Sequence, residues 1–530
     1  LKGLEAVFEY TFDKNIYDYH WYTGQYDYTT IQGGSSKSFV DDYLRKYKQH
    51  TNYNSINVYA TYNKDFGNHH FKVMAGFNQE SSYQETLDTY SYNQAVLDVP
   101  AMSSGTGTIK ATDSYSEYAI RGGFFRVNYN YLDKYLLEVN GRYDGSSKFP
   151  KSSRFGFFPS VSAGWQIAQE RFMNSTRHWL DGLKLRASYG VIGNQNINPY
   201  TFTPSMSVNN KATSWIIDDT YVTSISSLPA LVSQNFTWEK VGTINVGLDV
   251  NLFNNRLSGV FEWYQRNTNG MLAPGVQLPA VVGASAPYQN TADMRTRGWE
   301  LSLNWRDQIG KVGYRIGFNL SDYKSEIIKY DDNAATKLLS SYYPGQTLGE
   351  IWGYVVDGYY TVDDFVDTSS WQLKEGVTSI NGYNVRPGDV KFKNLRDDDT
   401  STNVITSGDN TFDNPGDRKV IGNTTPRYQY GINLGMNYAG FDLNVILQGT
   451  GKRDYWISNV LTFPMNGDNF VPLFEGLSDY WMPKDPDNGD WSAVNPNAKY
   501  PRIYGNRGNS GSNLRQSDKY LSDASYLRIK

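Results

Sequence analysis

Short and long connections alternate between the strands that this sequence predicts, and this alternation constrains the fold more than any single motif. The short connections are Phe66–His69, Tyr131–Lys134, Phe253–Arg256, Asp307–Lys311 and Tyr438–Phe441. The long connections are Asp13–Gln49, Glu80–Glu117, Gly190–Trp238, Thr268–Thr296, Lys324–Pro426 and Gly449–Ser525. Long loops at one end and short turns at the other are typical of an antiparallel β-barrel that crosses an outer membrane.

The strands themselves are predicted from alternation of apolar and polar residues. In Thr243–Leu252 the polar Asn245 lies on one face, and the other face carries Ile244, Val246, Leu248 and Val250. The apolar face carries no charge, as contact with lipid requires, whereas the polar face suits a water-filled interior. Aromatic residues beside the short turns fit the girdle at a membrane interface. They are Tyr131, Tyr135, Phe253, Trp305, Tyr438 and Phe441.

Composition excludes several classes of site. The chain has 530 residues and no cysteine, so disulfides and cysteine-based metal sites are impossible. Its formal net charge of −4 is small and mixed, which gives no indication of a nucleic-acid partner. The mean hydropathy is −0.58, and no apolar run reaches the length of a spanning helix. Barrel strands are compatible with this low value because their apolar residues alternate with polar ones.

The predicted strands number about thirteen between Lys2 and Gln448, and a fourteenth begins in Ser525–Lys530. A partial set of strands would leave unpaired edges in lipid, which a bilayer does not tolerate. We therefore expect residues 1–530 to be one incomplete barrel domain, with any signal peptide outside this segment. A soluble β-sandwich is the alternative, although its loops rarely exceed about 15 residues.

Several stretches of the chain together resemble the SusC/RagA family of TonB-dependent outer-membrane transporters. One of them reads YNYLDKYLLEVNGRYDGSSKFPKSSRFGFF, and another reads GQTLGEIWGYVVDGYY. The stretches follow the family's order along most of the sequence and are specific as a set. They are Tyr129–Phe158, Phe158–Trp165, Leu183–Ile197, Thr237–Gly259, Gly345–Tyr360, Lys419–Gly451 and Tyr520–Lys530.

The resemblance implies an all-β barrel of about 22 strands with a plugged lumen, in the outer membrane of a Gram-negative bacterium. It implies active, TonB-dependent import of glycan oligosaccharides, with peptides as a less favoured cargo. The partners it implies are a SusD-like surface lipoprotein, outer-membrane lipid, and TonB through a plug region that this segment lacks. A passive porin and a soluble carbohydrate-binding or hydrolytic β protein remain the alternatives.

Three local patterns predict turns. Asp144-Gly145, which follows Arg142, is expected to end a strand because Asp-Gly favours turn geometry. Asn254-Asn255 and Ala439-Gly440 are expected to form two-residue hairpins, since Asn and Gly tolerate positive φ angles. All three are interpreted as parts of the scaffold rather than as contacts to a substrate.

The segment Asn394–Asp417 is the most site-like acidic cluster in the chain. Closely spaced oxygen ligands suit a hard divalent cation, so a structural Ca²⁺ is predicted here. Its expected ligands are Asp397, Asp399, Asp409 and Asp413. In the SusC/RagA family this region often resembles an EF-hand loop, but here Asp399-Thr400 stands in place of the expected glycine, and no Glu closes the loop. A solvated acidic loop is the alternative.

Aromatic residues in the long loops form a second candidate site. Flat rings beside Asp and Asn suit stacking on sugar rings, in the manner of concave ligand sites. The predicted substrate-binding residues are Trp352, Tyr354, Trp371 and Trp456. The alternative is that these rings pack the loops against one another. Neither a GxSxG nucleophile motif nor a phosphate-binding loop occurs, so no enzymatic activity is predicted.

Overall fold

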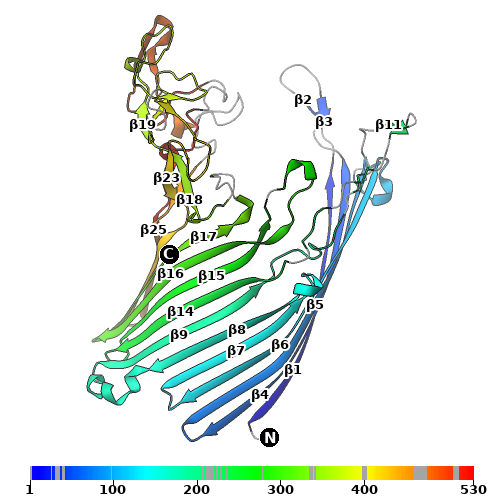
Figure 1. The fold of residues 1–530 in the computed structure, drawn as a ribbon, viewed down its shortest axis with the longest axis vertical. Coiled ribbons are helices and arrows are strands. Elements are labelled where there is room, and N and C mark those ends of the chain that lie inside the picture. Colours follow the sequence, from blue (N-terminus) through cyan, green and yellow to red (C-terminus); the bar gives the residue numbers. More distant parts are fainter. Residues whose placement is uncertain are drawn as a thin grey trace. The chain divides into compact units, whose positions relative to one another are not determined.

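The computed structural model describes residues 3–24, 27–29, 36–38, 42–96, 98–205, 208–209, 216–217, 220–221, 225–226, 230–233, 236–276, 278–333, 338, 342–396, 403–457, 474–504 and 512–530. Fourteen of the described strands form one large antiparallel sheet, in the order β1-β4-β5-β6-β7-β8-β9-β14-β15-β16-β17-β24-β25-β30 (Figure 1). The predicted all-β class and the predicted number of strands are therefore confirmed.

The strands of this sheet vary in length. Their bounds are β1 (Leu4–Thr23), β4 (Tyr43–Phe66), β5 (His69–Tyr92), β6 (Ile109–Tyr131), β7 (Tyr135–Ser146), β8 (Phe155–Gln166), β9 (Leu180–Asn194), β14 (Glu239–Leu252), β15 (Leu257–Pro274), β16 (Tyr288–Ile309), β17 (Val312–Tyr330), β24 (Arg427–Tyr438), β25 (Phe441–Lys452) and β30 (Tyr526–Ile529).

Short strands pair in the connections between them. They are β2 (Asp27–Thr29) with β3 (Ser36–Ser38), β10 (Val208–Asn209) with β13 (Ile225–Ser226), β11 (Ile216–Ile217) with β12 (Thr220–Tyr221), β18 (Glu350–Tyr354) with β23 (Arg418–Asn423), β19 (Val356–Tyr359) with β21 (Val390–Phe392), β20 (Ser379–Ile380) with β22 (Val404–Ile405), β26 (Asp454–Trp456) with β29 (Leu521–Asp523), and β27 (Pro483–Asp485) with β28 (Asp490–Ala493).

All helices in the described residues are short 3-10 turns. They are η1 (Met102–Ser104), η2 (Lys151–Ser153), η3 (Ile167–Gln169), η4 (Arg171–Thr176), η5 (Ala280–Val282), η6 (Asp331–Asn333), η7 (Val362–Asp364), η8 (Glu475–Leu477), η9 (Pro486–Asn488) and η10 (Asp518–Tyr520). None of these described helices has the length and hydropathy needed to cross a membrane.

The chain divides into two compact units, which we describe separately. Unit 1 comprises Leu1–Trp165, Arg186–Gly242 and Pro279–Asn290. Unit 2 comprises Gln166–Leu185, Thr243–Leu278 and Thr291–Lys530. Unit 1 thus contains the long strands at the start of the sheet, and unit 2 contains the strands that carry the two longest loops.

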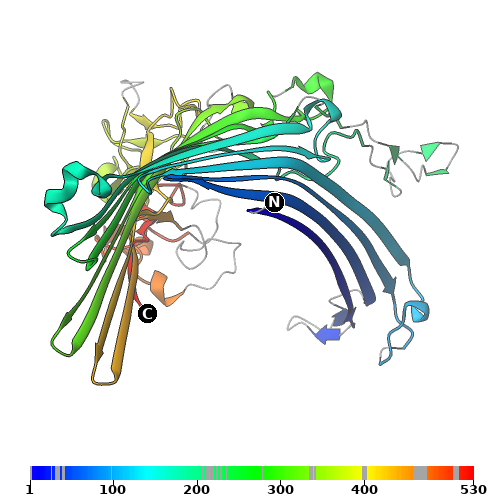
Figure 2. The same ribbon diagram turned by 90° about the horizontal axis from the view of Figure 1, so that it is seen from below.

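The long strands of unit 1 extend further than their sequence predicted. β1, β4, β5 and β6 have 20, 24, 24 and 23 residues, and they lie side by side in Figures 1 and 2. The predicted loops Asp13–Gln49 and Glu80–Glu117 are therefore too wide, since β1 continues to Thr23 and β5 to Tyr92. The alternation was missed there because tyrosine and threonine replace the aliphatic residues of the middle of each strand.

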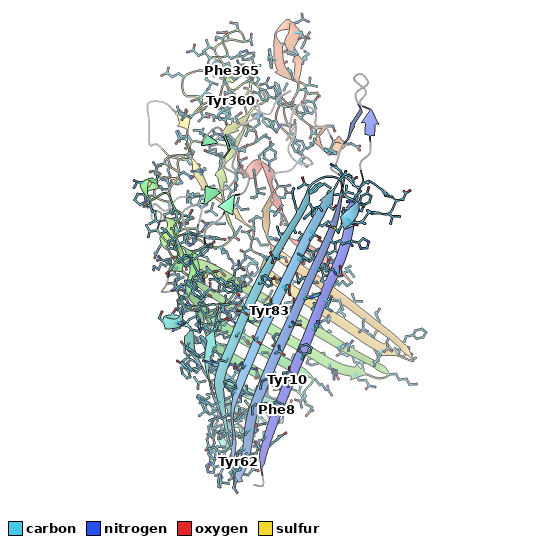
Figure 3. The ribbon with its side chains drawn as sticks, turned by 90° about the vertical axis from the view of Figure 1, so that its right-hand side faces the viewer. Phe8, Tyr10, Tyr62, Tyr83, Tyr360 and Phe365 are labelled. Carbon is cyan, nitrogen blue, oxygen red and sulfur yellow. The ribbon has the colours of Figure 1, made fainter. Side chains whose placement is uncertain are left out.

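The apolar faces of the strands lie where the alternation predicts. In unit 1 the register places Phe8 opposite Val58 and Tyr10 opposite Ile56, so these side chains share a face. Figure 3 shows Phe8 and Tyr10 along the same set of strands as Tyr62 and Tyr83. In unit 2 the exposed apolar face of β14 includes Ile244 (42%), Val246 (40%) and Leu248 (37%), with Val250 half-buried. Exposed aliphatic rows of this kind suit contact with lipid.

The short turns are confirmed in position, with one difference in detail. Ala439-Gly440 forms the predicted two-residue hairpin, with Tyr438 paired to Phe441 and φ angles of 48° and 87° in the turn. Asn254-Asn255 instead lies within a longer turn, Phe253–Arg256, in which Phe253 also has a positive φ of 58°. The two-residue hairpin predicted there is wrong, because β14 ends at Leu252 and β15 begins at Leu257, which leaves four residues in the turn.

Asp144-Gly145 does not form a turn. Both residues lie inside β7, where Asp144 pairs with Gly156 and Gly145 pairs with Phe155 of β8. The Asp144 carboxylate accepts two hydrogen bonds from Arg142 at 2.9 and 3.0 Å, and this side-chain pair replaces the local contacts that would bend the chain. The predicted strand end is therefore wrong, and the strand continues to Ser146.

In unit 2, two long connections fold together into a loop module, which we define as the described residues of Glu350–Asn423 and Asp454–Asp523. Its small sheets enclose their own hydrophobic core. The buried core residues are Tyr354, Tyr360, Phe365, Ile380, Val385, Val390, Phe392 and Ile405. The longest predicted loops are thus a folded structure rather than open chain.

Candidate functional site

Six tyrosines of unit 1 gather near the loop ends of β1, β4 and β5, and we call them the tyrosine cluster. The register places Tyr19 opposite Tyr47, and Tyr43 opposite Tyr92. Successive side chains of a strand alternate between faces, so Tyr43 and Tyr47 lie on the face opposite to the apolar Ile56. The members of the cluster are Tyr17, Tyr19, Tyr43, Tyr47, Tyr90 and Tyr92.

The rings of the cluster contact one another across strands. Tyr19 and Tyr47 are stacked, with centroids 5.1 Å apart and planes at 26°. Tyr43 contacts Tyr90 at 5.6 Å and Tyr92 at 5.8 Å. Aromatic pairs at these separations stabilise each other beyond simple burial, so the rings hold a defined arrangement.

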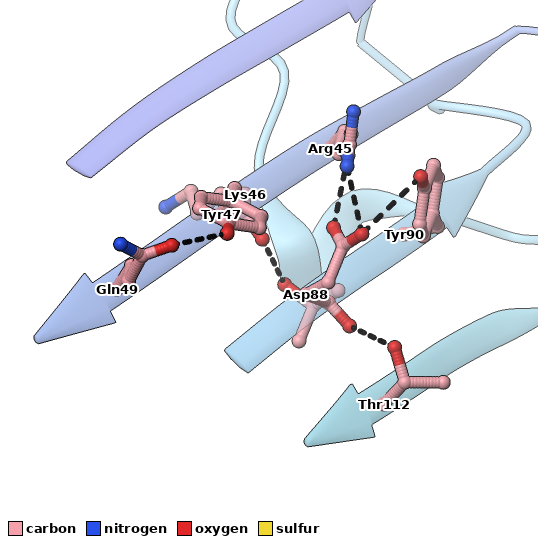
Figure 4. A network of polar contacts seen from close by, with 8 residues as sticks. Arg45, Lys46, Tyr47, Gln49, Asp88, Tyr90 and Thr112 are labelled. Carbon is pink, nitrogen blue, oxygen red and sulfur yellow. Dashed lines mark hydrogen bonds and ion pairs between the residues drawn. The ribbon is translucent and has the colours of Figure 1, made fainter. Parts of the chain in front are cut away.

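Arg45 and Asp88 form the polar centre of the cluster (Figure 4). The Arg45 guanidinium donates to both Asp88 carboxylate oxygens, at 2.9 and 2.8 Å. The same guanidinium lies 5.4 Å from the ring of Tyr19, 5.6 Å from Tyr47 and 5.2 Å from Tyr90. A bidentate ion pair combined with cation–π contacts fixes the guanidinium plane and therefore positions three rings at once.

The cluster lies far from the short turn that joins β4 and β5. At about 3.4 Å per residue, β4 is about 65 Å long from Phe66 back to Tyr47. With the usual barrel tilt of about 40°, this corresponds to a height of about 50 Å. The hydrocarbon core of a bilayer is only about 30 Å thick, so the cluster is placed beyond it, at the loop end of the strands. We call the part of the large sheet that lies in unit 1 the wall.

Below the cluster, the same face of unit 1 is polar. Asn57 donates to the Glu9 carboxylate at 2.9 Å, and both residues line a pocket of ≈ 490 Å³ together with Asn78 and Arg142. Further along, Asn140 donates to Glu138 at 2.8 Å and accepts from Arg126 at 2.7 Å. One face of the sheet in unit 1 is therefore apolar, and the other carries polar and charged groups, with Met74 and Phe124 among them.

Sequence reasoning missed the tyrosine cluster. Its signal is a period of two that continues into the predicted loops: Tyr at 17 and 19, Tyr-x-Arg-x-Tyr at 43–47, and Asp-x-Tyr-x-Tyr at 88–92. This pattern predicts strands with aromatic residues on one face. It was not recognised because those segments lack the row of alternating aliphatic residues that identifies a lipid-facing strand.

Two of the predicted substrate-binding rings lie in the cores of the loop module. Trp352 is 9% exposed, and its indole N–H donates to Tyr343 at 2.9 Å and to Glu350 at 2.8 Å. Tyr354 is 6% exposed, and its ring packs 5.2 Å from that of Phe392. These contacts bury both rings among residues of a single connection, Lys324–Pro426.

The other two predicted rings are half-buried. Trp371 lies 5.0 Å from Trp491 and 5.4 Å from Phe365, both in edge-to-face geometry. Trp456, in β26, packs against a small core that includes Tyr520. Tyr354 and Trp371 thus share one hydrophobic cluster, Trp352 and Trp456 lie in two others, and contact of the four rings with a substrate stays a prediction.

The acidic segment is organised by a residue outside the predicted ligand set. Asp417 is fully buried, and its carboxylate accepts from the backbone N–H of Leu395 and of Thr406, each at 2.8 Å. Asp409 and Asp413 are exposed, and Asp409 accepts from the hydroxyl of Thr411 at 2.6 Å.

Asp397 and Asp399 lie outside the described residues, so the geometry of the full predicted ligand set is not defined. Among the described residues, no group of three or more acidic or histidine side chains has the arrangement of a metal site. Ca²⁺ binding by Asp397, Asp399, Asp409 and Asp413 stays a prediction.

A buried carboxylate joins the two segments of the loop module. Asp389 has no solvent exposure, and it accepts from the Tyr504 hydroxyl at 2.5 Å and from Asn513 at 3.0 Å. Arg502 lies 3.6 Å from the same carboxylate. Burial raises the pKa of the Asp389 carboxyl above its ordinary value, and the nearby Arg502 charge offsets part of this shift.

Comparisons with known proteins agree with this geometry. The receptor named "TonB-dependent receptor P3" of Formosa agariphila is 28% identical over 527 residues, which cover 96% of this chain and 47% of that protein. The "TonB-dependent receptor SusC" of Bacteroides thetaiotaomicron is 32% identical over 283 residues, covering 52% of this chain and 27% of its own length. This chain spans less than half the length of the curated relatives it matches.

A solved structure, the RagAB peptide importer in its closed-closed state, superimposes with a TM-score of 0.76 over 100% of this chain and 53% of that chain, at 20% identity. That likeness shows the fold. Residues 2–528 match the family model described as "TonB dependent receptor-like, beta-barrel". Members of this family are outer-membrane receptors and transporters of Gram-negative bacteria and are not enzymes. The chain therefore belongs to the family of TonB-dependent receptor-like β-barrels, of the SusC/RagA type, and resides in the outer membrane.

Proposed function

We propose that the protein to which this chain belongs imports an oligosaccharide actively across the outer membrane, with energy delivered through TonB. The observation that carries the proposal is the two-faced wall of unit 1. Its outer face offers aliphatic side chains to lipid, and its inner face offers polar groups such as Glu9 and Asn57 below the tyrosine cluster. A wall of this kind suits a path for a hydrated, polar cargo.

Energised import is favoured over passive diffusion because of the size of the barrel. The described sheet has fourteen strands, and the family resemblance implies a barrel of about 22. Barrels of about 16–18 strands already leave an open aqueous channel. A barrel of this size leaks small solutes unless its lumen is filled. The family resemblance supplies a plug for this purpose, and coupling to TonB would move it.

An oligosaccharide is the favoured cargo because aromatic rings and hydrogen-bonding groups occur together on the inner face of the wall. Flat rings suit the apolar faces of sugars, and groups such as Asp88 suit their hydroxyls. Peptides are the second candidate. The solved RagAB structure is of a peptide importer, but at 20% identity it informs the fold alone.

A surface lipoprotein resembling SusD is the proposed partner at the loop end. The loop module supports this, since it has its own hydrophobic core and is large enough to present a stable surface. Trp371 and Trp456, which are only half-buried in that module, remain candidates for contact with cargo, together with Trp352 and Tyr354 after a rearrangement of the loops.

Uptake of labelled oligosaccharides by cells that carry the full-length protein tests the proposal. We expect saturable uptake that stops when the proton-motive force is collapsed, because the plug would then stay in place. Cells lacking the protein provide the background. Uptake that is unaffected by the collapse, and that rises in proportion to concentration, would identify a passive porin instead.

A further inference from the structure

We propose that the tyrosine cluster is a binding site for a neutral oligosaccharide at the outer mouth of the barrel, on the inner face of its wall. This inference rests on the proposed function and deepens it, because it names where the cargo first binds and which chemical class the site accepts. The residues of the site all lie on β1, β4, β5 and β6 in unit 1.

The position of the cluster makes it accessible from outside. It lies on the face opposite to the lipid-facing Ile56 and Val58, and beyond the hydrocarbon core by the strand lengths given above. Tyr17 remains 56% exposed and Trp21, which lies opposite Arg45 in the register, is 60% exposed. Aromatic rings with this exposure on the inner face form a surface on which a ligand could stack.

The pairing of Arg45 with Asp88 removes the main ionic attraction of the cluster, which favours a neutral ligand. Arg45 is neutralised by the bidentate pair with Asp88, and the three rings around its guanidinium occupy its open sides. Lys110 donates to the hydroxyl of Tyr92 at 3.2 Å and lies 4.7 Å from the same ring. The surface that remains consists of ring faces and hydroxyl groups, with the positive charge of Lys110 beside Tyr92.

Two of the three strands that carry the cluster, β4 and β5, offer no backbone edge for strand addition by a peptide, whereas β1 is the end strand of the described sheet. β4 pairs with β1 from Tyr43 to Tyr62 and with β5 along its whole length, and β5 pairs with β6 from His69 to Ser91. Peptides that bind sheets use free backbone groups at an edge, and β4 and β5 have no free edge here. Ring faces and polar side chains are what the site offers, and these match the apolar faces and hydroxyls of pyranose rings.

Polar groups beside the rings complete the match. The hydroxyl of Tyr47 donates to Gln49 at 2.8 Å, and that of Tyr90 donates to Asp88 at 3.4 Å. Both hydroxyl oxygens retain acceptor capacity. Thr112, whose hydroxyl donates to the backbone of Asp88 at 3.5 Å, extends the polar edge onto β6 (Figure 4). Sugar hydroxyls are thus offered hydrogen-bond acceptors around the stacking surface.

Binding to the purified full-length protein in detergent tests this site. The probes are hexasaccharides of α-1,4-linked glucose, β-1,4-linked glucose and β-1,4-linked mannose, compared with an anionic hexagalacturonate and with an uncharged hexapeptide. We expect at least one neutral hexasaccharide to bind, and we expect Tyr47→Ala and Tyr90→Ala each to weaken that binding about tenfold through loss of a ring contact.

Two further variants separate a binding role from a structural one. Tyr47→Phe keeps the ring and should retain most of the affinity. Tyr83→Ala removes a tyrosine from β5 on the opposite, lipid-facing side and should leave binding unchanged. Heat-modifiable migration in gels verifies that each variant is a folded barrel.

Several results would overturn the site. They are the absence of binding by all three neutral hexasaccharides, preferred binding of the galacturonate or the peptide, or equal effects of Tyr47→Ala and Tyr83→Ala. Energised oligosaccharide uptake that is insensitive to Tyr47→Ala would also overturn the site while leaving the proposed function intact. Binding that depends on Tyr47 but is not accompanied by energy-dependent uptake would overturn the proposed function while leaving the site intact.

Discussion

At the scale of single residues, buried charge decides how the loop module is held together. Asp389 ties the segment around β21 to the later connection that contains Tyr504 and Asn513, because both of these side chains donate hydrogen bonds to its carboxylate. In addition, the N–H of Val390 donates to Asn513 at 2.8 Å. Because these partners are more than a hundred residues away in sequence, this one carboxyl links two loops that have no local reason to associate.

The raised pKa of Asp389 predicts a pH dependence of the module. A carboxyl whose folded-state pKa exceeds its unfolded value binds its proton more tightly when folded. Its contribution therefore favours the folded module at acid pH and is lost as the pH rises from about 4 through the folded-state pKa. We expect the melting temperature of the wild type, relative to Asp389→Asn, to fall as the pH rises.

Tryptophan fluorescence follows this transition, since Trp371, Trp481 and Trp491 lie within the module. Asp487→Asn, an exposed carboxyl in the same module, is the matched control and should parallel the wild type at every pH. Identical pH profiles for the wild type and Asp389→Asn would show that the carboxyl does not titrate in the way that its burial requires.

At the scale of elements, the two faces of each strand experience different solvents. β14 shows this clearly: Leu248 lies on the exposed apolar face, whereas Asn245 donates to the Glu262 carboxylate at 3.0 Å on the other. A charge on the first face would enter hydrocarbon, and a charge on the second would remain among polar groups.

We therefore expect Leu248→Arg to destabilise the full-length barrel by about 2–4 kcal/mol if the residue lies near the membrane midplane. Asn245→Arg, three residues earlier on the opposite face, should cost much less. Urea-induced unfolding in lipid vesicles measures both free energies of unfolding. Equal losses would reverse or remove the assignment of faces on β14.

At the scale of the whole molecule, the ends of the strands predict a topology in the membrane. Short turns such as Phe253–Arg256 are expected in the periplasm, and the loop module is expected outside the cell. Both Asn255 and Asn488 are exposed, so a cysteine at either position is open to a reagent on its own side of the membrane.

In intact cells, Asn488→Cys should react with a membrane-impermeant maleimide, and Asn255→Cys should not. Both should react after the outer membrane is permeabilised, which controls for local accessibility. The chain contains no native cysteine, so the background from this sequence is zero. Labelling of Asn255→Cys alone in intact cells would invert the topology.

Much of this fold could be predicted because its determinants are local. The period of two in Thr243–Leu252 assigns each side chain to a face, and Ala439-Gly440 marks a hairpin through backbone conformations that few residues adopt. The wrong predictions also came from local patterns. Asp144-Gly145 has the composition of a turn, yet pairing along β7 and β8 keeps it extended, because cross-strand hydrogen bonds outweigh a weak local preference.

The sequence by itself determined the number of strands, their faces and the end of the sheet that carries the loops, since each depends on neighbours within a few residues. Only the tertiary structure decided which distant residues meet. Tyr19, Tyr47 and Tyr90 surround Arg45 because the register of three strands is set by pairing along more than twenty residues. Trp352 and Tyr354 became buried because distant residues of the same connection fold onto them, and burial of a ring depends on partners that no local pattern specifies.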